Sequence, residues 1–256
     1  MIKYFRKIRQ RLLTENKFSK YLLYAIGEIL LVVIGILIAL QINNQNDIRK
    51  ARIKEIHYLK NIKTDLKINI FELDNYIKTR KESIESANTI IEHIEGEPIK
   101  DIEEFNALGV PIYNWQKFHQ NNNTFQELVG SGNLALISND SIKNMLLNIE
   151  TLYKKLKSEE EHYRFDTEEL IYRPLYEMMD LNPMVNNFQY KLSNGTLGRN
   201  TTLTADYYKK FLASTKIKNG FVMTILEFST MNAQMLEMKN MSLKLINLID
   251  KEITKG

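Results

Sequence analysis

The chain has no cysteine and little proline or glycine. Its 256 residues include 4 Pro, 10 Gly and 1 Trp. Without cysteine it can form no disulfide, no thiolate zinc site and no iron–sulfur cluster. So few turn-forming residues argue against a β-sandwich and against a glycine-built nucleotide fold. The formal net charge of +4 is too small for the electrostatic footprint of a nucleic-acid-binding protein.

What the chain does contain is one long hydrophobic run, from Tyr21 to Leu40, whose single charge is Glu28. A helix of about 20 residues is about 30 Å long and matches the hydrocarbon core of a bilayer. A cleaved signal peptide would have a shorter run and a small-x-small cleavage site. Ala39-Leu40-Gln41 is a poor site of that kind. We therefore predict an uncleaved signal-anchor helix over residues 21–42.

Basic residues give the orientation of this anchor. Residues 1–20 hold seven Lys and Arg against one acidic residue, whereas the next basic cluster begins only at Arg49. The positive-inside rule then predicts a cytoplasmic N-terminus and an extracytoplasmic domain over residues 43–256. The segment 1–20 is either an amphipathic helix on an anionic leaflet or a set of cations that only fixes topology.

A long helix is predicted from Ile53 to Ile94, because apolar residues recur in two heptad rows. The two rows have twelve positions, of which all but Lys63 and Arg80 are apolar. They are Ile56, Lys63, Ile70, Ile77, Ile84 and Ile91, with Leu59, Leu66, Leu73, Arg80, Ala87 and Ile94. The further apolar residues Ile62, Ile68 and Phe71 widen the stripe, which favours a bundle over a bare two-stranded coiled coil. Residues 41–54 lack Pro and Gly, so the anchor should continue into this helix as a stalk.

The rest of the chain indicates further helices. Residues 99–139 should be irregular with short helices, and Asn139 or Asp140 should cap a helix that Pro174 kinks or ends. Residues 184–202 are predicted to form a surface loop or small hairpin. A last long helix should follow from Thr204 to Ile253, with Asn219-Gly220 as its one breaking point. The prediction is an all-α fold: a transmembrane helix, a stalk, and an antiparallel bundle of three or four long helices.

Two blocks of sequence resemble a known family. They are the opening, MIKYFRKIRQRLLTENKFSKYLLYAIGEILLVVIGILIALQINNQN, and residues 124–153, TFQELVGSGNLALISNDSIKNMLLNIETLY. Both are similar to an uncharacterised family of single-span membrane proteins, a domain of unknown function, from flavobacteria and related Bacteroidetes. Gln45 departs from it, since members often have Trp after Asn-Asn. The resemblance implies an inner-membrane anchor and supplies no catalytic residues.

Glu28 is the residue of the anchor with the clearest chemical interest. An ionised carboxylate near mid-membrane costs about 3 kcal/mol. Glu28 could relay protons, hydrogen-bond across a helix–helix interface, or reach the cytoplasmic headgroups. Gly27, Gly35 and Ala39 form a ridge of small residues, which predicts a helix-association face.

No catalytic or metal-binding motif is visible. The four histidines, His57, His93, His119 and His162, form no H-x-x-x-H or H-E-x-x-H pair. Ser131 in Gly-Ser-Gly lacks the G-x-S-x-G context of a nucleophile. We therefore expect no enzyme activity, no metal and no cofactor.

Four aromatic residues cluster in the irregular region: Tyr113, Trp115, Phe118 and Phe125. They could contact a partner or plug the end of the bundle.

The function expected is a scaffold, accessory subunit or sensor-like module that binds the bilayer and either its own copies or another membrane protein. Nothing indicates a nucleic acid or a small-molecule substrate. The alternative is a subunit of an ion-coupled transporter or motor that uses Glu28 as its proton carrier.

Overall fold

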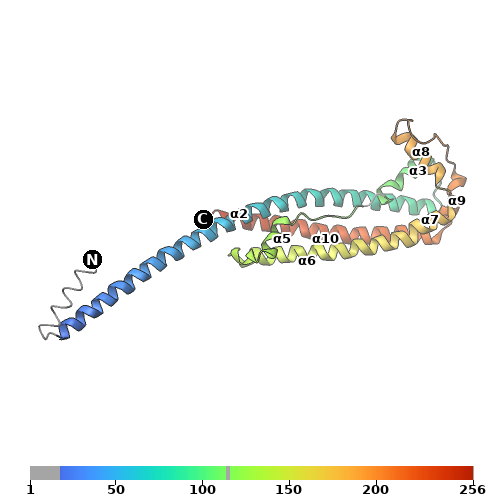
Figure 1. The fold of residues 1–256 in the computed structure, drawn as a ribbon. Helices are drawn as coiled ribbons and strands as arrows, with labels where there is room; N and C mark the ends of the chain where they lie inside the picture. The colour runs from blue at the N-terminus through green and yellow to red at the C-terminus, as the bar shows by residue number, and fades with distance from the viewer. Residues whose placement is uncertain (1–17, 114–115, 256) are drawn as a thin grey trace. The chain divides into compact units, whose positions relative to one another are not determined.

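The computed structural model describes residues 18–113 and 116–255 (Figure 1). Within these residues every regular element is helical and there is no strand, which confirms the predicted all-α fold. The predicted amphipathic segment lies almost wholly outside the described residues. The chain divides into two compact units, residues 1–57 (unit 1) and residues 58–256 (unit 2).

Helix α2 runs from Phe18 to Ile94, so the apolar helix continues into the predicted stalk helix as expected. It ends where the sequence indicates, because Gly96 adopts a φ of 117° that side-chain-bearing residues rarely reach. In unit 1 its large apolar side chains are exposed from Leu22 to Ile42. From Ala25 onward the helix is long and apolar enough to cross a membrane.

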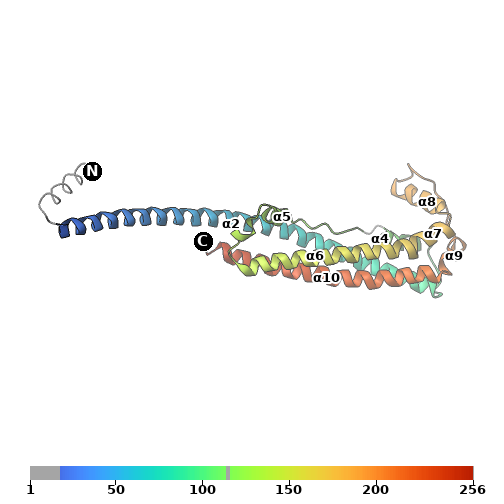
Figure 2. The same cartoon turned by 60° about the horizontal axis from the view of Figure 1, so that its bottom comes forward.

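Three long helices form unit 2: the second half of α2, α6 (Asp140–Thr167) and α10 (Thr215–Ile253). Figures 1 and 2 show them side by side. Helix α10 runs antiparallel to α2, because Lys63 pairs with Asp250 at one end and Glu95 with Lys218 at the other. It also runs antiparallel to α6, whose N-cap Asn139 bonds to Glu252. Helices α2 and α6 therefore run in the same direction.

That arrangement requires the chain to travel back along the bundle between α2 and α6. It does so through α3 (Ile102–Leu108), α4 (Val110–Tyr113), the extended residues 116–122, α5 (Asn123–Gly130) and η1 (Asn133–Leu136). The extended stretch, here called the return segment, is held by side chains of α2. Asn69 makes two hydrogen bonds to the backbone of Asn121, at 2.8 and 2.7 Å, and the Tyr76 hydroxyl donates to Lys117 O at 2.7 Å.

The buried face of α2 differs by one residue from the predicted one. The row from Leu59 to Ala87 is buried as expected, but its partner row consists of the buried Ile62, Asn69, Ser83 and Ile90, with the half-buried Tyr76 between them. The predicted isoleucine row is only half-buried, and Ile68 and Phe71 are exposed. Polar residues can occupy this buried face because they have hydrogen-bond partners. The return segment binds Asn69 and Tyr76, and Ser83 Oγ donates to Thr79 O within α2.

The second half of the chain corrects several boundaries. Pro174 does not end the helix, because α6 passes through the π-helix η2 (Glu168–Tyr172) into α7 (Arg173–Met178). Of the loop predicted over residues 184–202, the first half is wrong, because it belongs to helix α8 (Asn182–Leu192), which has Pro183 in its first turn, where proline is tolerated. Residues 193–202 contain no helix or strand, as a loop requires.

The last long helix also begins later than predicted. Thr204 precedes η3 (Ala205–Tyr208) and α9 (Lys209–Leu212), and α10 is capped by Ser214. Gly220 does not break α10. A Cβ at that position would lie 2.5 Å from Ile171 Cγ1, so the glycine allows α10 to pack closely against η2.

Unit 2 buries two apolar clusters along the bundle. The first joins α2, α6 and α10 and includes Leu59, Leu73, Leu156, Phe228 and Met235. The second joins the end of α2 to α3, η2, α9 and the start of α10, and includes Ala87, Phe105, Ile171, Phe211 and Phe221. The methionines Met231, Met235 and Met238 are buried in the first cluster.

Candidate functional site

The candidate residues of the anchor lie on the surface of unit 1. Glu28 and Ala39 are exposed, and a Cβ on Gly27 or Gly35 would meet no atom within 4 Å. This face is therefore unoccupied among the described residues and stays a predicted association face. No described side chain contacts Glu28 as a relay partner would, so the structure lends no support to the ion-coupled alternative.

The four aromatic residues do not form one exposed cluster, which corrects the idea that they contact a partner together. Phe118 is 0% exposed, and its ring packs edge-on against Tyr76 at 5.7 Å. Phe125 is also buried in the first apolar cluster, whereas the Tyr113 ring lies 5.9 Å from Tyr172 beside the second cluster. Trp115 lies outside the described residues. Phe118 and Phe125 therefore fill the core.

Two charged clusters stand out, and the first is a fully buried ion pair between α2 and α6. Arg80 Nη2 lies 2.7 Å from Glu160 Oε1, and their side chains are 5% and 0% exposed. Glu160 Oε1 also accepts the backbone N–H of Phe118 at 2.9 Å, and Oε2 accepts Lys157 Nζ at 3.0 Å. Every oxygen of the buried carboxylate is therefore satisfied.

The Arg80 guanidinium is nearly as buried as its partner. It lies 5.8 Å from the ring centre of Tyr76 and 5.6 Å from that of Phe228, a cation–π arrangement. Burial lowers the pKa of Arg80, and the charge of Glu160 opposes that shift. Both charged groups of this pair are buried and both carboxylate oxygens have donors, so we interpret the pair as stabilising the fold rather than binding a ligand.

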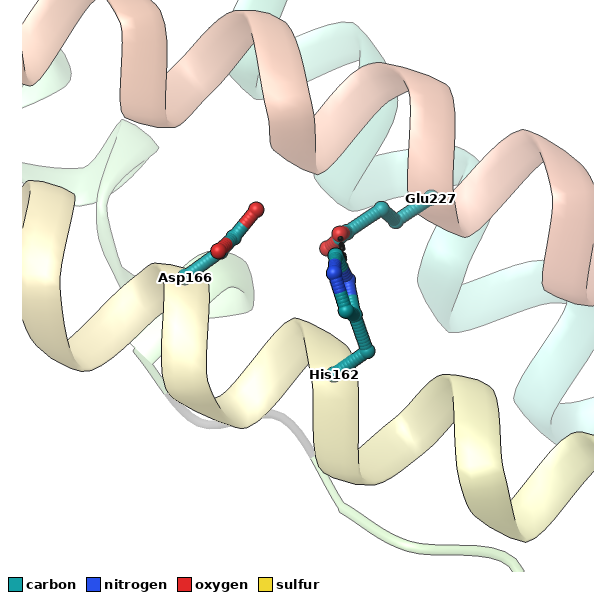
Figure 3. Close-up of side chains that lie close together, drawn as sticks. All are labelled: His162, Asp166 and Glu227. Carbon is teal, nitrogen blue, oxygen red and sulfur yellow. Dashed lines mark hydrogen bonds and ion pairs between the residues drawn. The ribbon is translucent and has the colours of Figure 1, made fainter.

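The second cluster lies between α6 and α10 and consists of His162, Asp166 and Glu227 (Figure 3). His162 and Asp166 are four residues apart on α6, so they share one helix face. Glu227 reaches across from α10, and its Oε1 lies 2.7 Å from His162 Nδ1. One nitrogen or oxygen atom from each residue lies within 4.8 Å of the others. We call this set the His162 cluster.

The His162 cluster is half open and half buried. The His162 side chain is 61% exposed, whereas Glu227 is 8% exposed. Glu227 Oε2 is buried and has no hydrogen-bond partner among the described residues. The hydrogen bond with Glu227 raises the pKa of His162. Burial raises the pKa of Glu227, and the hydrogen bond with His162 opposes that rise.

The motifs considered above do not reveal the His162 cluster. They are histidine pairs, whereas the signal here is H-x-x-x-D, a histidine and an aspartate one turn apart. The third member comes from another helix, and spacing along the chain does not reveal it.

A third feature is an exposed row on α10. Eight positions at alternating spacings of four and three residues all face outward: Val222, Leu226, Ser229, Ala233, Leu236, Asn240, Leu243 and Asn247. None is charged, and the four large apolar side chains are between 42% and 58% exposed. The spacing is that of a coiled-coil seam. We call these positions the outer row.

Comparison with known proteins yields one finding. No curated protein and no solved structure matches the chain. A family model described as a family of unknown function, DUF6090, matches residues 28–173. The match covers more than half of the chain and runs from the apolar helix through the return segment to η2. The chain therefore belongs to DUF6090, a family whose function is unknown.

Proposed function

We propose that this protein is a single-span protein of a bacterial inner membrane that acts by protein–protein interaction, without enzymatic activity. Residues 21–42 span the bilayer, residues 1–20 lie in the cytoplasm, and residues 43–256 form a periplasmic domain. The exposed apolar surface of α2 in unit 1 supports the anchor, because in water this surface would stay in contact with solvent, whereas a bilayer would cover it. The compact core of unit 2 supports a folded domain beyond it.

The observation that carries this proposal is the outer row of α10, and its occupant is a second copy of this chain. The outer row fills both core positions of a heptad repeat. One position holds Leu226, Ala233, Asn240 and Asn247, and the other holds Val222, Ser229, Leu236 and Leu243. A row without charge does not call for a partner of opposite charge. It is complementary to itself, and asparagine at a seam position fixes the register and number of strands.

The anchor strengthens this self-association. Two copies held in the same bilayer meet at a raised effective concentration, so a short seam is sufficient. The small-residue face at Gly27, Gly35 and Ala39 offers a second contact within the membrane. We infer a scaffold whose joints are these two faces.

The absence of cysteine provides a direct test. In the full-length protein in nanodiscs, Leu236→Cys introduces the sole thiol, and a parallel seam places it opposite its own copy. Mild oxidation should yield a disulfide-linked dimer. Lys78→Cys, at an exposed position of α2, is the matched control and should stay largely monomeric.

A second variant tests the energetics of the same contact. Leu226→Lys combined with Leu236→Lys places like charges in the seam and should reduce the dimer fraction about tenfold or more, measured by native mass spectrometry. Equal crosslinking at Leu236 and Lys78 would contradict the proposal. So would recovery of the protein only with an unrelated membrane partner, which would make it an accessory subunit.

A further inference from the structure

We propose that His162, Asp166 and Glu227 bind a divalent transition-metal ion of the Zn²⁺ or Mn²⁺ class. This inference is independent of self-association, because all three ligands come from one chain. The site would join α6 to α10 near the surface of the bundle. No ligand set of this kind was expected from the sequence.

The geometry needs only small side-chain movements. With metal–ligand bonds of about 2.0–2.1 Å, tetrahedral ligands lie about 3.3 Å apart. The His162 Nδ1–Glu227 Oε1 separation of 2.7 Å would widen slightly, while the widest separation in the cluster, within 4.8 Å, would shorten. Figure 3 shows the Asp166 carboxylate extending from α6 toward α10, where that closure would take place.

The buried oxygen of Glu227 gives an independent reason to expect a ligand. Glu227 is more than nine-tenths buried, and its Oε2 has no hydrogen-bond partner among the described residues. A buried polar atom without a partner carries a desolvation cost that nothing offsets. A bound cation beside the carboxylate would supply the missing interaction.

Charge around the cluster points the same way. Carboxylates from both helices raise the pKa of His162: Glu227 on α10, and Asp166 and Glu159 on α6. With a neutral imidazole as ligand, Glu227 and Asp166 together carry two negative charges. A divalent ion balances them, whereas a proton on His162 balances only one.

The ligand types select the class of metal. Imidazole nitrogen suits Zn²⁺ and similar ions, and carboxylate oxygens also suit Mn²⁺. Mg²⁺ prefers an oxygen-only shell and keeps several waters, so it should bind this site more weakly. Because His162 is 61% exposed, water can reach the ion and complete the coordination that three protein ligands leave open.

The test is calorimetric titration of the untagged, chelator-stripped full-length protein with Zn²⁺ alone and then Mg²⁺ alone. We expect one Zn²⁺ per chain, with Mg²⁺ binding at least tenfold weaker. Asp166→Asn and His162→Gln should each weaken Zn²⁺ binding about tenfold or more. His119→Gln, at an exposed histidine outside the cluster, is the matched control and should bind as wild type does.

A spectroscopic reading makes the result independent of folding. Co²⁺ bound to wild type should develop visible absorption bands that Asp166→Asn removes, while far-UV circular dichroism shows the variant folded. Several outcomes would overturn the site: no saturable Zn²⁺ binding, equal loss in His119→Gln, or a stoichiometry of one ion per two chains. The last would place the metal between copies.

Discussion

Helix α6 carries two charged clusters that begin only two residues apart, yet they differ in every respect that matters for function. Residues i and i+2 of a helix point about 200° apart, so Glu160 faces α2 and His162 faces α10. Glu160 receives three donors and is 0% exposed. Glu227, across from His162, receives one and keeps an oxygen without a partner.

The two clusters show how a charged group that only stabilises the fold differs from one that can bind a ligand. Around Arg80 and Glu160 both carboxylate oxygens have donors, so the pair holds α2, α6 and the return segment together and leaves no oxygen without a partner. The His162 cluster also contains a buried carboxylate, but Glu227 Oε2 has no hydrogen-bond partner among the described residues and the neighbouring His162 is exposed to solvent. Burial alone therefore does not mark a carboxylate as functional. A buried oxygen without a partner, next to a solvent-exposed ligand, is the better indicator.

The largest effect should come from Glu160→Gln. The change leaves the Arg80 guanidinium buried without its counter-charge, and breaking a buried pair in this way costs about 3–5 kcal/mol. Urea denaturation of the full-length protein, followed by circular dichroism, measures the loss. A loss below about 1 kcal/mol would mean that the pair is not a structural element.

Removing both charges should restore much of that loss. Arg80→Met with Glu160→Gln fills the space with an apolar chain, and the amide oxygen still accepts the Phe118 N–H. We expect the double variant to be at least about 2 kcal/mol more stable than Glu160→Gln alone, because a buried pair often adds little over an apolar replacement. The same denaturation experiment decides it, and a further loss would count against the interpretation.

The identical substitution in the other cluster should be nearly silent. Glu227→Gln, in metal-free protein, removes a carboxylate whose partner His162 is mostly solvated. The expected change is within about 1 kcal/mol, because an ion pair with one solvated partner is screened by water and contributes little. If Glu227→Gln is as damaging as Glu160→Gln, the two clusters are of one kind.

The smallest effect should be a pH dependence specific to the His162 cluster. The pKa values of His162 and Glu227 are raised above their ordinary values of 6.5 and 4.5. The folded state therefore holds these protons more tightly than the unfolded state. The stability that His162 contributes is fully present below pH 6.5 and is lost as the pH rises through its raised pKa.

The measurement is the difference in Tm between wild type and His162→Gln across that range, with chelator present. The difference should shrink as the pH rises. A Tm difference that grows as the pH rises would show that folding lowers the pKa of His162 instead of raising it.

Much of the fold followed from local patterns. The heptad row from Leu59 to Ala87, the Asn139 cap and the stop at Gly96 each depend on residues close together in the chain, so sequence was enough. The second row of α2 was misplaced because Asn69 looks like a surface residue until the return segment lies over it. Gly220 looked like a helix break because the contact that requires a glycine there is with Ile171, which is 49 residues away in sequence.

The candidate site was less accessible to prediction. His162 and Asp166 are visible as an i, i+4 pair, but Glu227 joins them only through the packing of α10 on α6. The family match ends at residue 173, so it contains two of the three proposed ligands and not the third.

The return segment also has a consequence for how the molecule acquires its structure. An up-and-down bundle folds fast because neighbouring helices pair locally, so its contact order is low. Here the chain doubles back, and the contacts that join the long helices span 65 residues between His162 and Glu227, 80 between Arg80 and Glu160, and 187 between Lys63 and Asp250. The closest in sequence, α6 with α10, should close first. Helix α2 is synthesised before α6 and α10, so its apolar face stays exposed to solvent until both of these helices have been made and have packed against it.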